Sequence, residues 1–443
     1  MTTGAADFFS EPWLRDISAQ SPCSKVPELR KDTMQGTPKN MRLHIGIFGR
    51  RNVGKSSLLN AITRQAVSIV SPEAGTTTDP VEKPMELLPL GPVLFIDTAG
   101  IDDEGALGQA RVARTRAILD RADLAVLVAE SGQWGRFEEG LLDEFSQRHL
   151  PALVALNKCD LLPAGETVPE SPRRHEIPEV RLSATTGQGL QDLRQALLDL
   201  APEDFFESRP ILSDLVPPGR TAVLVIPIDK EAPKGRIILP QVQAIRDLLD
   251  HGGVSVVVQE RELESALANL REPPALVVTD SQAFREVAAM VPPSVPLTSF
   301  SILFSRFQGD LVEQVRGALG IECLREGDRI LVAEACTHHP IGDDIGRVKI
   351  PRWLREFTGL ALDFVTVQGH DFPQDLSPYS LVIHCGSCMG NRKEMLSRIL
   401  RCRQQGVPIT NYGLTIAYSL GIFERALAPF PEALGALRAA GGR

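Results

Sequence analysis

The sequence of 443 residues predicts an α/β protein, in which a doubly wound domain with a mostly parallel sheet precedes two smaller α/β domains with parallel sheets. Three observations support this prediction. The chain is too long for a single hydrophobic core. Short apolar runs alternate with segments of helical length, which is typical of strand–helix–strand units with parallel strands. The alternation is interrupted near residues 201–210 and 291–296, so it divides into three units.

These interruptions set the expected domain boundaries. The expected segments are residues 1–40, a flexible tail; 41–205, the doubly wound domain; 206–297, a second α/β domain; and 298–443, a third. In the first domain we expect strands at 43–49, 93–98, 124–130, 153–157 and 180–184, with helices at 55–63 and 189–200. In the later domains we expect strands at 221–229, 255–260, 275–280, 329–336, 361–367 and 380–385.

The composition is that of an ordinary globular protein, with 43% apolar and 23% charged residues. The formal net charge of -9 argues against broad contact with a nucleic-acid backbone. The N-terminal stretch has no apolar run suited to a signal peptide or a membrane span, so we expect a cytoplasmic protein without membrane association. Thiols stay reduced in that compartment. The seven cysteines are therefore candidates for metal binding or catalysis before disulfides.

A phosphate-binding loop follows the first expected strand. Residues 49–56 read Gly-Arg-Arg-Asn-Val-Gly-Lys-Ser, which fits G-x-x-x-x-G-K-S between a strand and a helix. The glycines let backbone N–H groups curl around phosphate oxygens at a helix N-terminus, where the dipole favours anions. We expect Lys55 to reach the outer phosphates and the Ser56 hydroxyl to bind magnesium.

Three further elements follow in the order that GTPases have. Residues 97–100, Asp-Thr-Ala-Gly, end an apolar strand, so the aspartate can hold magnesium through water and the glycine N–H can face the γ-phosphate. Residues 157–160, Asn-Lys-Cys-Asp, resemble the N-K-x-D element, in which the Asp160 carboxylate would accept the two N–H groups of guanine. Residues 183–185, Ser-Ala-Thr, match the loop that backs the base. The predicted nucleotide is GTP or GDP.

The first switch segment is expected at residues 75–79, Gly-Thr-Thr-Thr-Asp. It resembles the G-T-T-R-D segment of tRNA-modification and ribosome-assembly GTPases, with Thr78 replacing the arginine, and by that match Thr77 would bind magnesium. Asn52 stands where potassium-stimulated members of that superfamily carry an asparagine; the alternative is a simple loop residue. Ile101 stands where Ras-type proteins have a water-orienting glutamine, and an apolar side chain cannot orient water. We therefore expect slow hydrolysis, stimulated by potassium or a partner.

A pattern of cysteine and histidine lies in the third domain. It reads Cys336-x-His338 after one expected strand and His384-Cys385-x-x-Cys388 after another. Residues i and i+2 of an extended segment face the same side, and C-x-x-C suits two thiolates on one metal centre, with the intervening glycine permitting a tight turn. Both groups end strands, where ligands of open α/β sheets gather. Spacing leaves two metals open: structural zinc, or a 4Fe–4S cluster with one exchangeable position.

These motifs define the candidate site residues. Those expected to bind the nucleotide are Gly49, Asn52, Val53, Gly54, Lys55, Ser56, Ser57, Asn157, Lys158, Asp160, Ser183 and Ala184; those expected to act in catalysis are Lys55, Thr77, Asp97 and Gly100. The expected metal ligands are Cys336, Cys385, Cys388, His338 and His384 for the metal centre, Ser56 and Thr77 for magnesium, and Asn52 for potassium.

The two motifs together resemble one family, the (FeFe)-hydrogenase maturation GTPases called HydF. The similarity runs from about residue 41 to about residue 425 and includes the stretches DDIGRVKIPRWLR and PITNYG. The resemblance implies potassium-stimulated GTP hydrolysis by the doubly wound domain and homodimerisation through the second domain. It also implies a 4Fe–4S cluster on Cys336, Cys385 and Cys388, with a labile fourth position that His338 or His384 could occupy.

The same resemblance implies a role as scaffold and carrier. Proteins of this family receive the di-iron subcluster of the hydrogenase active site through two radical-SAM maturases and deliver it to the apo-hydrogenase. Two rival interpretations stay open. One is a ribosome-assembly or tRNA-modification GTPase with a structural zinc site. The other is a non-enzymatic interaction domain that zinc stabilises, with the GTPase as a regulatory switch. The first would need a basic RNA-binding surface, against which the acidic sequence pI of about 5.5 argues.

Overall fold

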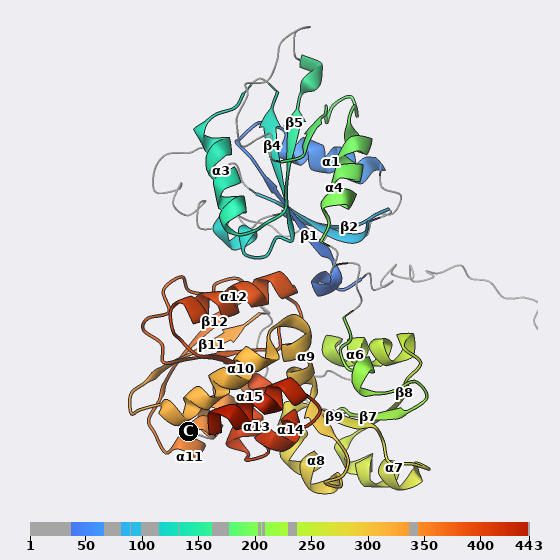
Figure 1. The fold of residues 1–443 in the computed structure, drawn as a ribbon, viewed down its shortest axis with the longest axis vertical. Coiled ribbons are helices and arrows are strands. Elements are labelled where there is room, and N and C mark those ends of the chain that lie inside the picture. The colour runs from blue at the N-terminus through green and yellow to red at the C-terminus, as the bar shows by residue number, and fades with distance from the viewer. Residues whose placement is uncertain are drawn as a thin grey trace, which may run out of the picture. The chain divides into compact units, whose positions relative to one another are not determined.

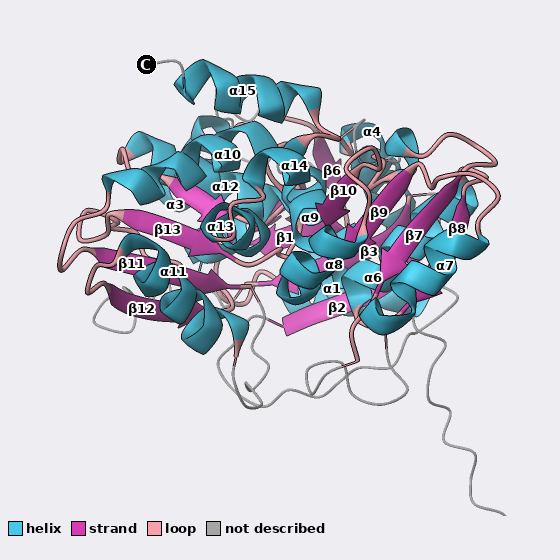
Figure 2. Ribbon diagram, turned by 90° about the horizontal axis from the view of Figure 1, so that it is seen from below, coloured by secondary structure: helices cyan, strands magenta, loops and turns pink. Residues whose placement is uncertain are grey.

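The described strands form three sheets, and helices lie beside each of them (Figures 1 and 2). The computed structural model describes residues 37–65, 81–88, 90–98, 115–131, 133–161, 177–202, 205, 209–228, 237–335 and 344–441. Within Thr37–Arg443 the described residues form one compact unit. Among them, no helix is both long and apolar enough to span a lipid bilayer.

The first domain is a six-stranded sheet with the order β2-β3-β1-β4-β5-β6, in which only β2 is antiparallel to its neighbour. Its elements are β1 (Leu43–Phe48), α1 (Lys55–Gln65), β2 (Val81–Leu87), β3 (Gly91–Asp97), β4 (Leu124–Glu130), α3 (Arg136–Gln147), β5 (Ala152–Asn157), β6 (Glu179–Arg181) and α4 (Leu190–Leu200). Two cores confirm the doubly wound prediction. Ile45 and Ile47 of β1 pack with α1 and α4 on one face, and Phe48 packs with α3 on the other.

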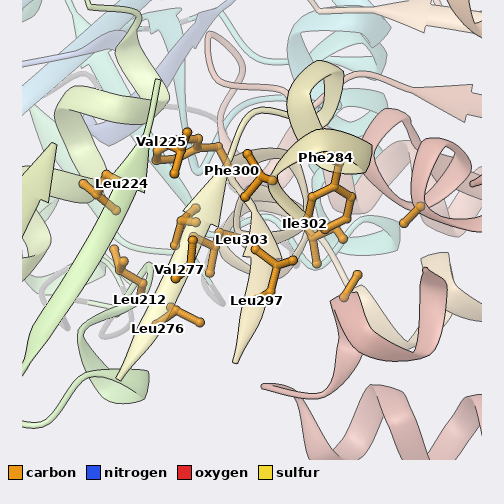
Figure 3. Packing of buried hydrophobic residues seen from close by; sticks show 14 of the residues in the cluster. Leu212, Leu224, Val225, Leu276, Val277, Phe284, Leu297, Phe300, Ile302 and Leu303 are labelled. Carbon is orange, nitrogen blue, oxygen red and sulfur yellow. The ribbon is translucent and has the colours of Figure 1, made fainter. Parts of the chain in front are cut away.

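The second sheet has the order β10-β9-β7-β8 and is parallel throughout. Its elements are β7 (Thr221–Val225), α6 (Leu239–Asp250), β8 (Val254–Val258), α7 (Leu263–Asn269), β9 (Leu276–Thr279), α8 (Phe284–Met290), β10 (Leu297–Ser299) and α9 (Phe300–Gln308). Figure 3 shows its core, where Val225 and Val277 lie with Phe300 and Leu303. The parallel α/β character predicted for this domain is confirmed.

The third sheet has the order β12-β11-β13-β14 and is also parallel throughout, as predicted. Its elements are α10 (Leu311–Leu319), β11 (Arg329–Glu334), a π-helical turn (Ile345–Lys349), α11 (Ile350–Thr358), β12 (Asp363–Gln368), β13 (Leu381–His384), α12 (Arg392–Gln404), β14 (Ile409–Asn411), α13 (Tyr412–Ser419), α14 (Phe423–Leu427) and α15 (Pro431–Gly441). Alternate residues of β11 enter opposite cores: Leu331 packs against α12, and Ile330 packs against α11.

The core of the second domain is completed from the end of the chain. Leu414 of α13, Phe423 and Leu427 of α14 and Ala433 of α15 belong to the same buried cluster as the strands β7 and β9. This cluster also includes α9 and α10, which lie beyond the interruption at 291–296. The second and third domains therefore share a core, and the residue at which one ends and the other begins stays a prediction.

Strand β2 was not expected from the sequence. Val81–Leu87 contains two glutamates, a lysine and Pro84, which hide the apolar alternation of a strand. It lies at the edge of the sheet and pairs only with β3, a position in which a proline without an N–H is tolerated. A Pro inside a strand-like run is therefore no argument against an edge strand.

Helix α10 approaches β14 through a glycine. A Cβ on Gly317 would lie 1.9 Å from the backbone oxygen of Ile409, whereas a Cβ on Gly435 in α15 would meet no atom within 4 Å. We expect Gly317→Ala to push α10 off the sheet and to lower the free energy of unfolding by about 1–3 kcal/mol or more. Gly435→Ala, the matched control, should be neutral or stabilising by up to about 1 kcal/mol. Urea unfolding measures both, and equal midpoints for the two variants would contradict the close approach.

Candidate functional site

The loop between β1 and α1 has the backbone geometry of an anion cradle. Three of its residues have positive φ: Gly49 at 143°, Asn52 at 64° and Gly54 at 96°. Both glycines of the loop are also sterically required. A Cβ on Gly49 would lie 2.2 Å from the Val128 oxygen, and a Cβ on Gly54 would lie 2.3 Å from Nδ2 of Asn157. The sequence pattern thus reflects backbone shape that other residues could not adopt without strain.

Lys55 is folded over this loop. Its side chain is buried, and Nζ donates hydrogen bonds to the backbone oxygens of Gly49 (2.9 Å) and Arg50 (2.6 Å). An ammonium held at the mouth of the loop by carbonyl oxygens is positioned to meet phosphate oxygens that enter it.

Ser56 and Asp97 meet beside the loop. The Ser56 hydroxyl donates to Oδ2 of Asp97 at 2.8 Å. Burial raises the pKa of Asp97, although the Ser56 hydrogen bond and the Lys55 charge oppose the rise. Oδ1 of Asp97 is buried and finds no hydrogen-bond donor among the described residues. A hydroxyl and a carboxylate with one unpartnered buried oxygen are hard oxygen ligands of the kind that magnesium prefers, so these residues fit the ion.

The base-side elements are joined by Asn157. Its Nδ2 donates to the Val53 oxygen (2.8 Å), and its Oδ1 accepts from the Ala184 N–H (3.0 Å). This buried amide therefore ties the end of β5 to both the phosphate loop and the 183–185 loop. Lys158 turns the chain with a φ of 62° and pairs with Glu130 at 2.7 Å.

The remaining base-side residues are also placed. Asp160 lies in an exposed 3₁₀ turn, Cys159–Leu161, where its carboxylate can accept from a base. The buried Ser183 hydroxyl accepts from the Thr186 N–H at 3.1 Å and fixes the adjoining loop. Ser57 is an exposed residue of the first turn of α1.

Several expected site residues lie outside the described residues. They are Thr77, Gly100, Cys336 and His338, together with the rest of the expected switch segment and Ile101. Their predicted roles stay predictions.

Parallel pairing brings the ends of β11 and β13, the strands that precede the two cysteine motifs in the chain, to one sheet edge. Strands β11 and β13 are neighbours, with Ala333 opposite His384, so the segments that follow both strands begin side by side. The Ala335 N–H donates to Sγ of Cys385 at 3.0 Å, and the Cys385 N–H donates to the Ala333 oxygen at 2.9 Å. An N–H aimed at sulfur stabilises a thiolate, which is the form that binds a metal.

The turn between the two cysteines differs from expectation in one detail. The left-handed conformation falls on Ser387, with a φ of 53°, and not on Gly386. Among the described residues, no group of three or more His, Cys, Asp or Glu side chains could hold a metal. Cys385 and Cys388 are half-buried, whereas burial raises the pKa of Cys402 to about 12 and keeps that sulfur protonated.

His384 is placed differently from a metal ligand. It is fully buried; Nδ1 lies 2.7 Å from the Cys385 oxygen, and Nε2 lies 2.7 Å from Nη1 of Arg398. A carbonyl only accepts and a guanidinium only donates, so Nδ1 carries the proton and Nε2 accepts. Both ring nitrogens are therefore occupied. This geometry counts against the prediction that His384 binds the metal, because the sequence could not show the arginine that takes its free nitrogen.

The arginine belongs to a buried network that sequence reasoning missed. Arg398 also donates to the Gly369 oxygen (2.7 Å) and to Oε1 of Glu394 (2.5 Å). Glu394 accepts from His370 at 2.9 Å. Burial alone would raise the pKa of Glu394, but the His370 hydrogen bond and the Arg398 charge hold that pKa far below its usual range. The i,i+4 spacing of Glu394 and Arg398 was the available signal.

A cavity opens beside the second cysteine. It encloses about 190 Å³ and is mostly apolar; its lining includes Pro227, Asp280, Phe304, Cys388 and Tyr412. These residues follow or flank the carboxyl ends of β7, β9, β13 and β14. The cavity thus lies where parallel α/β sheets collect ligands, with a thiol in its wall.

Comparison with known families matches the chain in three parts. Residues 44–158 match a family described as 50S ribosome-binding GTPase, residues 211–309 match the hydrogen maturase F dimerization domain, and residues 312–429 match the hydrogen maturase F tetramerization domain.

Curated relatives match a little over a third of the chain. The tRNA modification GTPase MnmE of Ralstonia nicotianae is 36% identical over 176 residues, which are 38% of this chain and 36% of the relative. GTPase Der of Wolinella succinogenes is 38% identical over 180 residues, which are 38% of this chain and 37% of the relative. The chain thus spans little more than a third of the length of these relatives.

Two solved structures match part of the chain at low TM-scores. The Era protein of Aquifex aeolicus has 21% identity and a TM-score of 0.31, with 56% of this chain and 97% of that chain covered. The G domain of the T. maritima FeoB iron transporter has 24% identity and a TM-score of 0.28, with 36% of this chain and 99% of that chain covered.

The exposed Asp160 carboxylate provides a test of base recognition. Asp160→Asn replaces one acceptor by a donor, so it should weaken GTP binding by about 10- to 100-fold. Xanthine has a carbonyl where guanine has an amino group, and XTP binding should improve. Fluorescent-nucleotide titration measures both affinities. Asp199→Asn, on the exposed end of α4, should change neither. Unchanged GTP affinity in Asp160→Asn would refute the assignment.

Proposed function

The chain belongs to the hydrogen maturase F (HydF) family, since a GTPase domain precedes both domains that define that family, and from this premise we propose its full function. The protein is a GTP-hydrolysing scaffold that binds a 4Fe–4S cluster, and it assembles and delivers the di-iron subcluster of (FeFe)-hydrogenase. The observation that carries this proposal is the thiol pair Cys385 and Cys388 at an edge shared by β11 and β13, in a chain that also has a complete phosphate loop.

Hydrolysis follows from the described residues of the first domain. Lys55 stabilises charge on the outer phosphates, and the backbone N–H groups of the loop from Gly49 to Gly54 hold them in place. Magnesium, held by Ser56 and through water by Asp97, would neutralise charge that develops on the γ-phosphate. We include in the proposal that Asn52 binds potassium, and that turnover is slow without it.

The cluster is proposed to bind through three thiolates, those of Cys336, Cys385 and Cys388. Because His384 has both nitrogens occupied, His338 is the better candidate for the exchangeable fourth position. A carrier needs such a position, since a cluster with four protein thiolates would leave no site for cargo. The proposed partners are two radical-SAM maturases and the apo-hydrogenase, without nucleic acid.

The similarity to MnmE and Der favours no second function for the whole chain. It covers 38% of this chain and little more than a third of each relative. A structural zinc site in place of the cluster is an outcome of the experiment that follows.

Iron and sulfide analysis of anaerobically purified protein tests the cluster. The wild type should contain about four irons and four sulfides per chain, with broad absorbance in the 400-nm region. Cys385→Ser should lose most of both. Cys323→Ser, which changes an exposed thiol away from the edge, should retain them. Colourless protein with one zinc per chain would overturn the cluster proposal and favour the structural site.

Oligomerisation is supported by the matched dimerization and tetramerization domains, and we propose that β8 forms the dimer contact. This strand ends the second sheet, and none of the described strands pairs with its outer edge. It leaves Val254 and Val257 46% and 44% exposed, beside exposed Val242 and Leu249 of α6. Apolar side chains on an open strand edge are ready to pair with a second copy.

A charge on this edge should prevent that pairing. We expect Val257→Lys to shift the protein towards smaller assemblies by at least about tenfold in dissociation constant, because a lysine would be buried against its symmetry mate. Leu88→Lys, at a fully solvated turn of the first domain, is the control. Sedimentation velocity across a concentration series gives the constants. An unchanged assembly in Val257→Lys would place the dimer contact elsewhere.

A further inference from the structure

The first domain contacts helix α12 of the third domain through one short turn, Asp120–Asp123. Nδ2 of Asn391 donates to the Arg121 oxygen at 2.8 Å. The Ser397 hydroxyl donates to the Asp120 oxygen at 2.9 Å, and Arg401 pairs with the Asp120 carboxylate at 2.6 Å. The turn and the helix therefore meet through polar groups with defined directions.

A fourth contact is a partly buried hydrogen bond between side chains. Nη1 of Arg121 donates to Nε2 of His370 at 2.7 Å, and the Arg121 side chain is only 2% exposed. The other nitrogen of His370 therefore carries the proton and donates to Glu394, which also accepts from Arg398. Arg121 and Arg398 are both buried, so the displacement of a group that they contact would leave a buried guanidinium without that partner.

The Asp120–Asp123 turn is attached to two strands of the nucleotide-binding domain, β2 and β1. Nη1 of Arg121 donates to Glu82 at 2.8 Å, and Glu82 is the second residue of β2, which follows the expected first switch. The helical residues 115–119 join the turn to the part of the chain that follows the Asp97-Thr98-Ala99-Gly100 motif. Asp123 exchanges hydrogen bonds with the backbone of His44 at 2.8 and 2.9 Å, in the strand that leads to the phosphate loop.

At its other side, α12 is attached to the cysteine loop. Asn391 caps the helix by accepting from the Glu394 N–H at 3.2 Å, only three residues after Cys388. One turn further, Arg398 donates to Nε2 of His384, whose Nδ1 donates to the Cys385 oxygen. The residue that caps the helix is thus also the residue that bonds to the first domain.

We propose that α12 is a coupling element, by which the nucleotide state of the first domain sets the position of the Cys385–Cys388 loop. The coupling enters the described residues at Glu82 and at residues 115–119, and a shift of either one displaces the Asp120–Asp123 turn. The turn moves Asn391 and His370, and Arg398 transmits that change to His384 and the Cys385 backbone. Arg398 and His384 are positioning residues in this scheme. The nature of the metal centre rests on the proposed function, but the coupling itself needs only the nucleotide and the cysteine loop.

Hydrogen–deuterium exchange of the full-length, cluster-free protein tests the coupling. In the wild type, the amides of residues 385–395 should exchange at rates that differ by about fivefold or more between GDP and a non-hydrolysable GTP analogue. Asn391→Asp keeps the helix cap but removes the donor to Arg121, and Arg401→Gln removes the ion pair with Asp120. In both variants the difference should disappear while nucleotide affinity is retained.

Arg403→Gln is the matched control, because it removes the same charge from an exposed position of the same helix. It should preserve the wild-type difference. Equal exchange with both nucleotides in the wild type would overturn the coupling, as would an undiminished difference in Asn391→Asp and Arg401→Gln. Iron analysis of the same preparations is independent of these outcomes, so failure of the cluster proposal is distinguished from failure of the coupling.

Discussion

Parallel pairing of β11 with β13 is the constraint on which the cysteine site depends. The two motifs are separated by 45 residues in the chain, and the parallel pairing of neighbouring strands starts both loops side by side at one edge. The same rule operates in the first domain, where β1, β3 and β5 end at the phosphate loop, Asp97 and Asn157. Each site is thus a set of loops that the sheet collects, and the chemistry is supplied by the residues at the strand ends.

The two sites become rigid by different means. In the phosphate loop the shape is set by backbone: glycines at positive φ stand where any Cβ would collide. In the cysteine loop it is set by buried polar groups, chiefly Arg398 and Glu394 behind His384. A buried ion pair gives little net stability, since desolvation offsets its attraction. Its effect here is to fix His384, because the hydrogen bond from Arg398 leaves the imidazole one tautomer and one orientation.

Features set by local sequence could be predicted, whereas features set by contacts between distant side chains could not. Gly49, Gly54 and Lys55 occur at fixed local spacings, so the nucleotide loop and its strand were visible without structure. The parallel sheets followed from apolar runs. Strand β2 was hidden by its charges, and the partner of His384 was hidden because a lone arginine in a helix usually faces solvent. Contacts made across the fold leave no local pattern, and His384 was therefore taken for a metal ligand.

The occupied nitrogens of His384 have a consequence for any metal carried by this edge. If a histidine that adjoins a cysteine ligand is held by an arginine, the cysteine backbone cannot move without breaking a buried hydrogen bond. The loop is then held against its own sheet, and a change in its position requires a movement of the helix that carries the arginine. Helix α12 begins three residues after Cys388 and is capped by Asn391, the side chain that also bonds to the first domain. Rigidity at the thiols and sensitivity to the nucleotide are therefore compatible, because both depend on how this one helix is held.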